Sequence, residues 1–433
     1  MNNNLSRRGI LTGALGLGVM ITTAACGGGG SDAGAEAADY TEPAADITAD
    51  LTFSLWDQTQ VEALQQNIAS FQEKYPNIKV TISVTPFAQY FTKLQTQASS
   101  DTLPDLFWMN GPNFQLYAGN GKIAPITGPI EAGVIDPGKY PEALTTLYSL
   151  DDVQYGVPKD MDTIGVWVNK AVFEKAKVDL PGEDWTWQEF QSTAEAISKA
   201  LSKDGIYGGA GGMDGQTTYY NTIFESGGEV IADGKSGYAS AQSQQGISFW
   251  SDLIASGGSP SYAQLLDTTA DQWFVSGKLG MYWGGSWFRS ALSGTDIEDS
   301  ITVLPLPRGA RQATVIHGVA NLVAANSRNK QAAHTLQAYL SGAQAQQQLG
   351  EAGSVIPAYD GTQRTFAESM PDANLQVFLD AVDYAVPLPV SADTAAWNTL
   401  ETQLLPDAFS GAKPVAEVTA DLASQMDAVL AKG

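Results

Sequence analysis

The sequence has little cysteine, histidine or basic charge, and each scarcity excludes a class of protein. Among its 433 residues there is one cysteine, so no disulfide within the chain can support folding. The two histidines, His317 and His334, are too far apart for the His-Glu-x-x-His motif of zinc proteases, and there is no cysteine–histidine cluster. We therefore expect neither a metal ion nor a cofactor.

Basic side chains are outnumbered by acidic ones, with 23 Lys and Arg against 47 Asp and Glu and a formal net charge of −24. Such a surface repels phosphate backbones, which argues against a nucleic-acid partner. The sequence also lacks the Gly-x-Ser-x-Gly elbow of esterases, and the glycine-rich segment 208–215 has no phosphate-binding spacing. A glycosidase needs only two suitably placed carboxylates, so that class stays open.

The first 26 residues have the pattern of a secretory signal. Arg7 and Arg8 precede an apolar stretch at 10–21, which is too short to span a bilayer, and small residues lead into Cys26. The tetrapeptide ending at Cys26 resembles a bacterial lipoprotein signal. That resemblance implies removal of residues 1–25, acylation of Cys26 and a location on the outer face of the cell membrane. The arginine pair fits either twin-arginine or Sec export.

Residues 26–49 are rich in glycine, alanine, serine and acids, with Tyr40 as the one large apolar side chain up to Pro43. Such a segment cannot bury enough surface to fold, so we predict a flexible linker. The roughly 385 residues beyond it suffice for two domains, each with its own core.

The first of these domains shows an α/β pattern. Residues 51–56 and 78–84 alternate apolar and polar side chains as strands do, 61–75 and 89–99 have helical periodicity, and 104–109 is typical of a short buried strand. This order predicts a layered domain with a largely parallel sheet.

Ligands of such sheets bind at the carboxyl ends of the strands. The first and third strands end there in polar and aromatic residues. We therefore expect one shared rim formed by Trp56, Asp57, Gln58, Trp108 and Asn110.

Several ordered segments resemble the extracellular solute-binding proteins of ABC importers, specifically the carbohydrate-binding family 1 of the maltose and maltodextrin type. The resemblance covers the chain from Leu51 onward and rests on the whole ordered set of segments, since no single segment is specific to the family. Its segments are 71–80 (FQEKYPNIKV), 104–107 (PDLF), 156–163 (GVPKDMDT) with 168–170 (VNK), 185–189 (WTWQE), 277–281 (GKLGM) with 285–287 (GSW), and 327–333 (SRNKQAA).

That resemblance implies a two-lobed type II binding-protein fold of class α/β, in which each lobe has a mostly parallel sheet and the ligand lies between the lobes. The first lobe would comprise 50–160 with 311–365, and the second 165–306 with 370–433. The chain would cross between them near Asp160–Thr163, near Pro305–Arg308 and after Tyr359. Asp160 and Asp162 would then face the cleft from the hinge.

A sugar site combines aromatic rings, which stack on C–H faces, with side chains that hydrogen-bond hydroxyl groups. Trp283 and Trp287 flank glycines that let the backbone approach a ligand. By family resemblance, Trp287 and Trp397 stack on sugar rings and Asp162 accepts from hydroxyls. The remaining candidates are Gln216 and Tyr219 in a second-lobe loop, Arg289, and His317 where the chain re-enters the first lobe. For each of these side chains the alternative is ordinary packing, capping or a surface ion pair.

The function implied by the resemblance is capture of a sugar outside the cytoplasm and its delivery to an ABC permease, by a monomeric protein that is not an enzyme. Two alternatives remain. One is a non-sugar solute such as a polyamine, which would need carboxylates such as Asp57, Asp160 and Asp162. The other is a surface-anchored carbohydrate-active enzyme.

Overall fold

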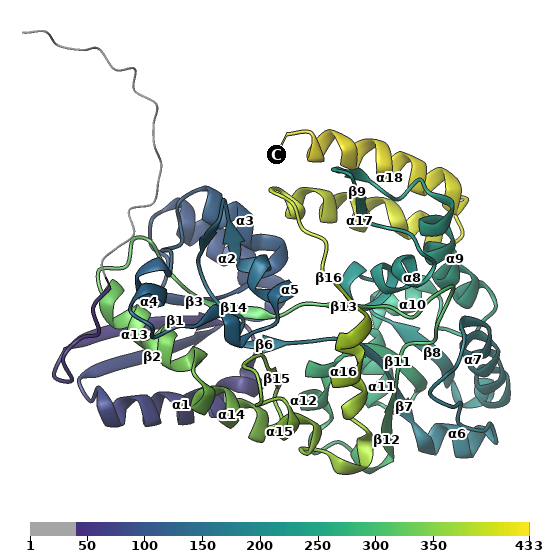
Figure 1. The fold of residues 1–433 in the computed structure, drawn as a ribbon. Coiled ribbons are helices and arrows are strands. Elements are labelled where there is room, and N and C mark those ends of the chain that lie inside the picture. Colours follow the sequence, from purple (N-terminus) through teal and green to yellow (C-terminus); the bar gives the residue numbers. More distant parts are fainter. Residues whose placement is uncertain (1–39, 433) are drawn as a thin grey trace, which may run out of the picture. The chain divides into compact units, whose positions relative to one another are not determined.

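The structure is a computed structural model that describes residues 40–432. Cys26, the predicted signal and the first part of the predicted linker lie outside the described residues. Within residues 40–432, two α/β lobes are joined by short strands that cross between them (Figure 1). The predicted two-lobed α/β class is confirmed.

The first lobe is built on a four-stranded sheet in the order β14-β3-β1-β2. Its strands are β1 (Ala49–Leu55), β2 (Ile78–Val84), β3 (Leu106–Asn110) and β14 (Val319–Val323). β1 runs parallel to β2 and β3, whereas β14 is antiparallel to β3. β14 comes from far along the chain, so this lobe is discontinuous in sequence.

Helices cover this sheet, and each buries one face. In α1 the core face contains Leu64, Ile68 and Phe71, at the spacing expected of an amphipathic helix. The helices are α1 (Val61–Lys74), α2 (Phe87–Ser99), α3 (Gly111–Gly119), α4 (Thr127–Glu131), α5 (Glu142–Thr145), α13 (Lys330–Ser341), α14 (Ala343–Glu351) and α15 (Arg364–Ala367). A small hairpin, β4 (Ser149–Leu150) with β5 (Val153–Gln154), completes the lobe.

The segment just before β1 is attached to this lobe, so the predicted linker to residue 49 is too long. The Tyr40 hydroxyl is 3.0 Å from Thr335 Oγ1, and the Tyr75 hydroxyl donates to Glu42 at 2.8 Å. Ala49 already pairs with Ile78. The composition of the segment concealed this, because the few anchoring side chains find their partners on distant helices.

The second lobe has a four-stranded sheet in the order β12-β7-β11-β8. Its strands are β7 (Ile164–Asn169), β8 (Tyr207–Gly211), β11 (Leu279–Gly285) and β12 (Ile301–Leu304). β11 is parallel to β8, but β7 is antiparallel to both β11 and β12. The prediction of a mostly parallel sheet is therefore wrong for this lobe. The reason is that β7 enters from the hinge and runs opposite to its neighbours on either side.

Helices cover this second sheet on both sides (Figure 1). α7 begins with a capping box formed by Thr186 and Glu189. The helices are α6 (Lys170–Ala176), α7 (Trp187–Leu201), α8 (Tyr220–Glu225), α9 (Ala241–Ala255), α10 (Tyr262–Asp267), α11 (Ala270–Val275), α12 (Arg289–Leu292), α16 (Gln376–Asp380), α17 (Thr394–Phe409) and α18 (Val415–Leu430). A hairpin of β9 (Ile231–Ala232) and β10 (Lys235–Ser236) packs against α18.

Four short strands join the lobes: β6 (Asp160–Met161), β13 (Thr314–Ile316), β15 (Ile356–Pro357) and β16 (Ala385–Pro387). β6 pairs with β15, and β13 pairs with β16. The second crossing was predicted near Pro305–Arg308, and this is wrong. Arg308 still pairs with Trp185 and Trp187 of the second lobe, and the chain crosses only at β13 and His317. Pro305 and Pro307 suggested a hinge, but they lie where β12 ends.

Candidate functional site

The centre of the site is the pair of crossing segments at Asp162 and His317. The Asp162 N–H donates to the His317 carbonyl at 2.8 Å, and the His317 N–H donates back to the Asp162 carbonyl at 3.1 Å. Both side chains are buried. The two predicted residues are therefore fixed to each other through the backbone, at the point where the lobes meet.

Asp162 also contacts the second lobe directly. The Ser286 hydroxyl, at the end of β11, donates a hydrogen bond to Asp162 Oδ1. Burial, and then the neighbouring Asp160 carboxylate, raise the pKa of Asp162 well above its usual value, while the Ser286 bond opposes this shift.

His317 brings two more predicted residues together. Gln216 Nε2 lies 2.7 Å from His317 Nε2, and the Trp287 and His317 rings meet edge to face at 5.1 Å. Burial lowers the pKa of His317 to about 3, so the imidazole is neutral near pH 7. Because the amide nitrogen of Gln216 can only donate, Nε2 is the acceptor and the ring proton sits on Nδ1. Trp287 remains half-buried.

On the first-lobe side, Asp160 is held by Lys159. Their side chains form a buried ion pair, and Asp160 Oδ1 also accepts from the Val319 N–H at 2.6 Å. Lys159 Nζ donates to Gln60 at 2.9 Å and lies 4.2 Å from the centre of the Trp108 ring. A cation over an aromatic face is attracted by its quadrupole, so this arrangement fixes Trp108 against the hinge.

The predicted first-lobe rim is assembled, although its members differ in accessibility. The Trp56 and Trp108 rings are 5.1 Å apart, but Trp56 is half-buried whereas Trp108 is 2% exposed. Gln58 is exposed, and half-buried Asn110 accepts from Asn113 at 2.9 Å.

Asp57 in the same rim caps the 3-10 turn Gln58–Gln60. It accepts from the Thr59 backbone at 2.8 Å, the Thr59 hydroxyl at 2.7 Å and the Gln60 amide at 2.8 Å. This corresponds to the capping alternative considered from the sequence.

Three predicted contacts are buried in the second-lobe core, and their role in ligand binding stays a prediction. Trp283 and Trp397 are fully buried, and Tyr219 is 3% exposed. Trp283 packs 4.9 Å from Trp250 and belongs to β11, whereas Trp287 lies beyond the strand, in the 3-10 turn Ser286–Phe288. The Trp397 indole donates to Ser391, and Tyr219 donates to Glu401.

Arg289 is not placed at this site either. Its guanidinium donates to the Ser369 carbonyl at 3.3 Å, in the segment where the chain makes its third crossing. It thus links α12 to that segment, and it forms none of the ion pairs found among the described residues.

Sequence reasoning missed three side chains near the site: Lys159, Ser286 and Phe87. The first two lie inside the quoted segments 156–163 and 285–287, next to residues that were chosen. Phe87 lies three residues beyond the end of β2 at Val84, so extending to this strand the rule that selected Trp56 at the end of β1 would have found it.

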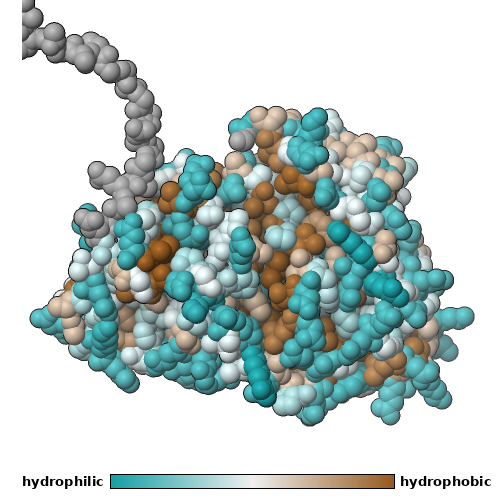
Figure 2. All heavy atoms as spheres, in the orientation of Figure 1, coloured by the Kyte–Doolittle hydropathy of each residue, from teal (hydrophilic) through white to brown (hydrophobic). Residues whose placement is uncertain are grey.

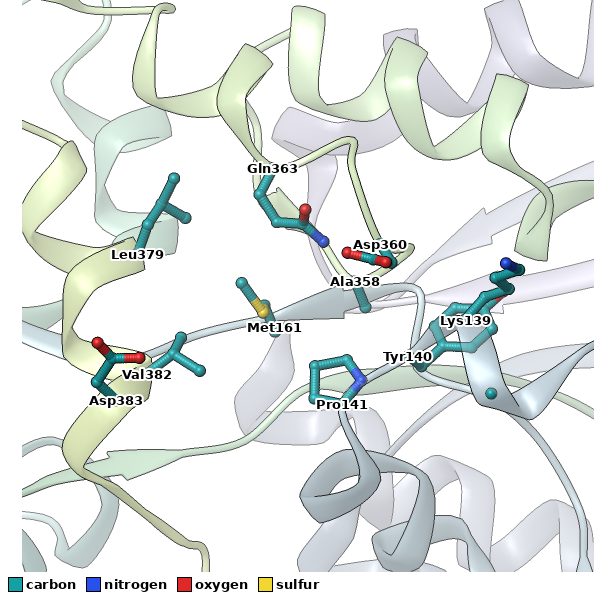
Figure 3. Close-up of a pocket in the computed structure, with 11 residues that line it drawn as sticks. Lys139, Tyr140, Pro141, Met161, Ala358, Asp360, Gln363, Leu379, Val382 and Asp383 are labelled. Atoms are coloured by element: carbon teal, nitrogen blue, oxygen red, sulfur yellow. The ribbon is translucent and has the colours of Figure 1, made fainter.

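A groove lies behind the hinge (Figure 3). Figure 3 shows Met161, from β6, between first-lobe residues such as Pro141 and Gln363 and second-lobe residues such as Leu379 and Val382. This groove has a volume of about 480 Å³. Adjacent side chains of a strand point to opposite faces, so Met161 lies on the face opposite Asp160 and Asp162. The groove and the candidate site are therefore on opposite sides of the hinge.

Two further searches concern residues 40–432. They contain no group of three or more His, Cys, Asp or Glu side chains that could hold a metal ion. No helix in this part of the chain combines the length and hydropathy needed to cross a membrane.

With this geometry in view, comparison with known proteins decides the family. Residues 56–347 match the sequence profile described as bacterial extracellular solute-binding protein. The chain belongs to this family. The resemblance found in the sequence is thereby confirmed, and members of the family are binding proteins of the extracellular space.

The individual relatives have low sequence identity to this chain. A putative binding protein of Brucella abortus is 26% identical over 61% of this chain, which spans only 64% of that relative's length. The diacetylchitobiose-binding protein DasA of Streptomyces coelicolor is 25% identical over 74% of this chain and 75% of the relative. An ABC substrate-binding protein of Listeria monocytogenes, solved in complex with cycloalternan, is similar in fold with a TM-score of 0.82. It is 21% identical, over 89% of this chain and all of that one.

Proposed function

We propose that this solute-binding protein captures a sugar between its lobes and delivers it to an ABC permease. The observation that carries the proposal is the junction at the hinge, where Gln216, Ser286 and Trp287 of the second lobe meet Asp162 and His317. DasA and the Listeria protein, by their names, bind saccharides, which supports the same ligand class here.

The chemistry of the junction suits a sugar. Trp287 offers part of an aromatic face for C–H groups, and Gln216 offers an amide for hydroxyls. His317 is neutral, so it adds no charge that an uncharged ligand would have to desolvate, and the raised pKa of Asp162 favours the uncharged form of that carboxyl.

A polyamine ligand is less consistent with these contacts. Such a ligand needs free carboxylates, but Asp57 accepts three hydrogen bonds from its own turn and Asp160 is paired with Lys159. The raised pKa of Asp162 further reduces the negative charge available to an ammonium group.

The same engagement of Asp57 and Asp160 supports binding without cleavage, since a glycosidase needs one carboxyl group as acid and another as base or nucleophile. We propose that the protein is not an enzyme. Incubation with oligosaccharides, followed by product analysis, tests this directly, and any cleavage that depends on Asp162 would overturn it.

We also propose that the protein acts as a monomer outside the cytoplasm, anchored by a lipid on Cys26. Cys26→Ala should release it from the membrane fraction or leave its signal uncleaved, with sugar affinity unchanged. Identical membrane fractions for both forms would contradict the anchor.

The decisive experiment is a ligand screen by thermal unfolding. The panel contains linear and cyclic α-glucans and chitin oligomers from diacetylchitobiose upward, with spermidine as the non-sugar comparison. A ligand at one hundred times its Kd adds about 2.7 kcal/mol to the free energy of unfolding. Stabilisation by spermidine and by no sugar would refute the proposal.

A substitution then connects the ligand to the site. Trp287→Ala should weaken binding of the identified sugar by about 1–3 kcal/mol, as for other binding hot spots. Trp273→Ala is the matched control, because Trp273 packs against Tyr207 of the same lobe, away from the hinge. Equal affinities of the two variants would contradict the site.

The hinge itself is tested by solution scattering. Capture between lobes requires an open form that closes on the ligand, so the radius of gyration should fall when the sugar is added. An unchanged radius at saturating sugar would contradict capture by closure.

A further inference from the structure

The first-lobe rim contains an exposed aromatic side chain that the hinge site does not use. Among the described residues, three large hydrophobic side chains are classed as exposed, and Phe87 is the aromatic one, at 55%. The other two, Leu180 and Leu266, belong to the second lobe. Exposed aromatic surface in an ordered setting is a common mark of a binding surface.

Phe87 is held in place by other rings. It packs edge to face against Trp56 at 5.6 Å and against Phe91 at 5.8 Å, and Trp56 and Phe91 are 5.9 Å apart. We call Trp56, Phe87 and Phe91 the rim cluster. All three side chains keep some exposure to solvent. Phe87 does not belong to the buried face of α2, which contains Tyr90, Leu94 and Ala98.

The rim cluster stands on the ligand-binding edge of the sheet. Trp56 follows β1 and Phe87 follows β2, and these parallel strands end in register with Leu55 opposite Val84. The carboxyl edge of an open α/β sheet is where ligands bind. In Figure 1, α2, which begins at Phe87, lies in the first lobe near α3, the helix that contacts α17 of the second lobe.

The cluster is continuous with the hinge. Trp56 contacts Trp108 at 5.1 Å, and Trp108 lies under Lys159, which is paired with Asp160. A row of aromatic rings therefore leads from the hinge outward to Phe87. Phe87 is the outermost ring of this row. Trp56 lies between it and Trp108, the ring beneath Lys159.

We propose that Phe87, supported by Trp56 and Phe91, is an outer subsite that stacks on a sugar unit beyond the unit held at the hinge. The natural ligand is then an oligosaccharide rather than a monosaccharide, and Phe87 determines the preference for chain length. This inference rests on the proposed function, because a ring platform is assigned to a sugar only if the hinge site binds one.

The test is affinity as a function of ligand length, measured by calorimetry with the oligomer series that the panel identifies. Phe87→Ser removes the ring that stacks on the outer sugar unit, so it should weaken binding of the longer oligomers by about two- to tenfold. Binding of the shortest member should change less than twofold. Phe87→Tyr should restore the affinity for long oligomers, because it keeps the ring.

Leu180→Ser is the matched control, since it also removes an exposed apolar side chain, and it should leave every affinity unchanged. Thermal unfolding of each variant shows whether the lobe stays folded. A loss that is equal at all lengths, or absent at all lengths, would overturn the subsite while leaving the proposed function intact. Failure of the unchanged protein to bind any sugar would instead overturn the proposed function and this inference with it.

Discussion

Asp162 and His317 exchange two backbone hydrogen bonds and so tie together two of the segments that connect the lobes. Because both residues also reach the second lobe, through Ser286 and Gln216, a change at the ligand site acts directly on the hinge. Rotation of the lobes must then be absorbed on either side of this pair.

The first prediction concerns Trp283, which the structure places in the core. Trp283→Ala should lower the free energy of unfolding by about 3–5 kcal/mol, because it removes a fully buried indole that packs against Trp250. Half-buried Trp287→Ala should cost much less stability. Chemical denaturation of both variants measures this difference, and similar stabilities would mean that Trp283 is not a core residue.

The second prediction uses the lowered pKa of His317. In the unfolded chain the imidazole binds a proton near pH 6.5, whereas burial lowers its pKa to about 3 in the fold. The unfolded state therefore binds more protons between these values, and His317 makes stability fall by up to about 1.4 kcal/mol per pH unit as the pH drops through this window. His317→Gln should lose this contribution, seen as the difference between the two stability profiles from pH 7 to 4. Parallel profiles would contradict the buried neutral imidazole.

The third prediction concerns Glu401 on α17, whose effect on the pH dependence of stability has the opposite sign to that of His317. Burial raises its pKa to about 7, against the lowering effect of hydrogen bonds from Tyr238, Asn398, Tyr220 and Tyr219. The folded state then binds more protons than the unfolded chain between about pH 4.5 and pH 7. Glu401 therefore stabilises the fold fully at the acidic end of this window and loses that contribution as the pH rises.

Glu401→Gln should remove this slope, because an amide does not titrate. Denaturation of both proteins at several pH values between 4.5 and 8 measures it. A stability difference that stays constant over this range would show that Glu401 does not titrate there.

The fourth prediction uses the groove behind the hinge (Figure 3). Val382→Trp should fill part of the groove and keep its two walls apart. Since the groove and the candidate site lie on opposite sides of β6, separation at the groove favours closure at the site. Sugar affinity should rise, and the radius of gyration without sugar should fall.

Val415→Trp on α18 is the control for that substitution, because it adds the same ring at a partly exposed position of the second lobe. If Val382→Trp weakens sugar binding and Val415→Trp does not, separating the walls of the groove does not favour closure at the candidate site.

The surface in Figure 2 agrees with a site between the lobes, since hydrophobic side chains gather in a band along the region where the lobes meet. At its upper end the lobes touch. A β-carbon built on Gly111 would lie 3.6 Å from Val390 Cγ1, and α3 contacts α17.

From the sequence alone, the family resemblance gave the two-lobed α/β fold and placed Asp160 and Asp162 at the hinge, whereas the pairing of Asp162 with His317 came from the structure. That resemblance rests on ordered segments that can be read without knowing the packing, and strand alternation with helical periodicity indicated the layered α/β pattern of the first lobe. The rim of Trp56 and Trp108 followed from one topological rule, that parallel strands end at the same edge of their sheet.

Only the tertiary structure decided which tryptophans are open. Trp283 and Trp287 are four positions apart beside the same glycines, yet one is buried under α9 and the other meets His317. Trp283 lies within β11 under α9 and Trp287 in the turn after the strand, so the end of the strand and the partner helix set this difference, and neither is visible in composition. Composition also misplaced the second crossing between the lobes, because the prolines suggested a position earlier in the chain than β13. It could not show the exposure of Phe87 either, since that depends on how α2 packs. Burial is a property of contacts between distant segments, so it becomes known only when those segments are brought together.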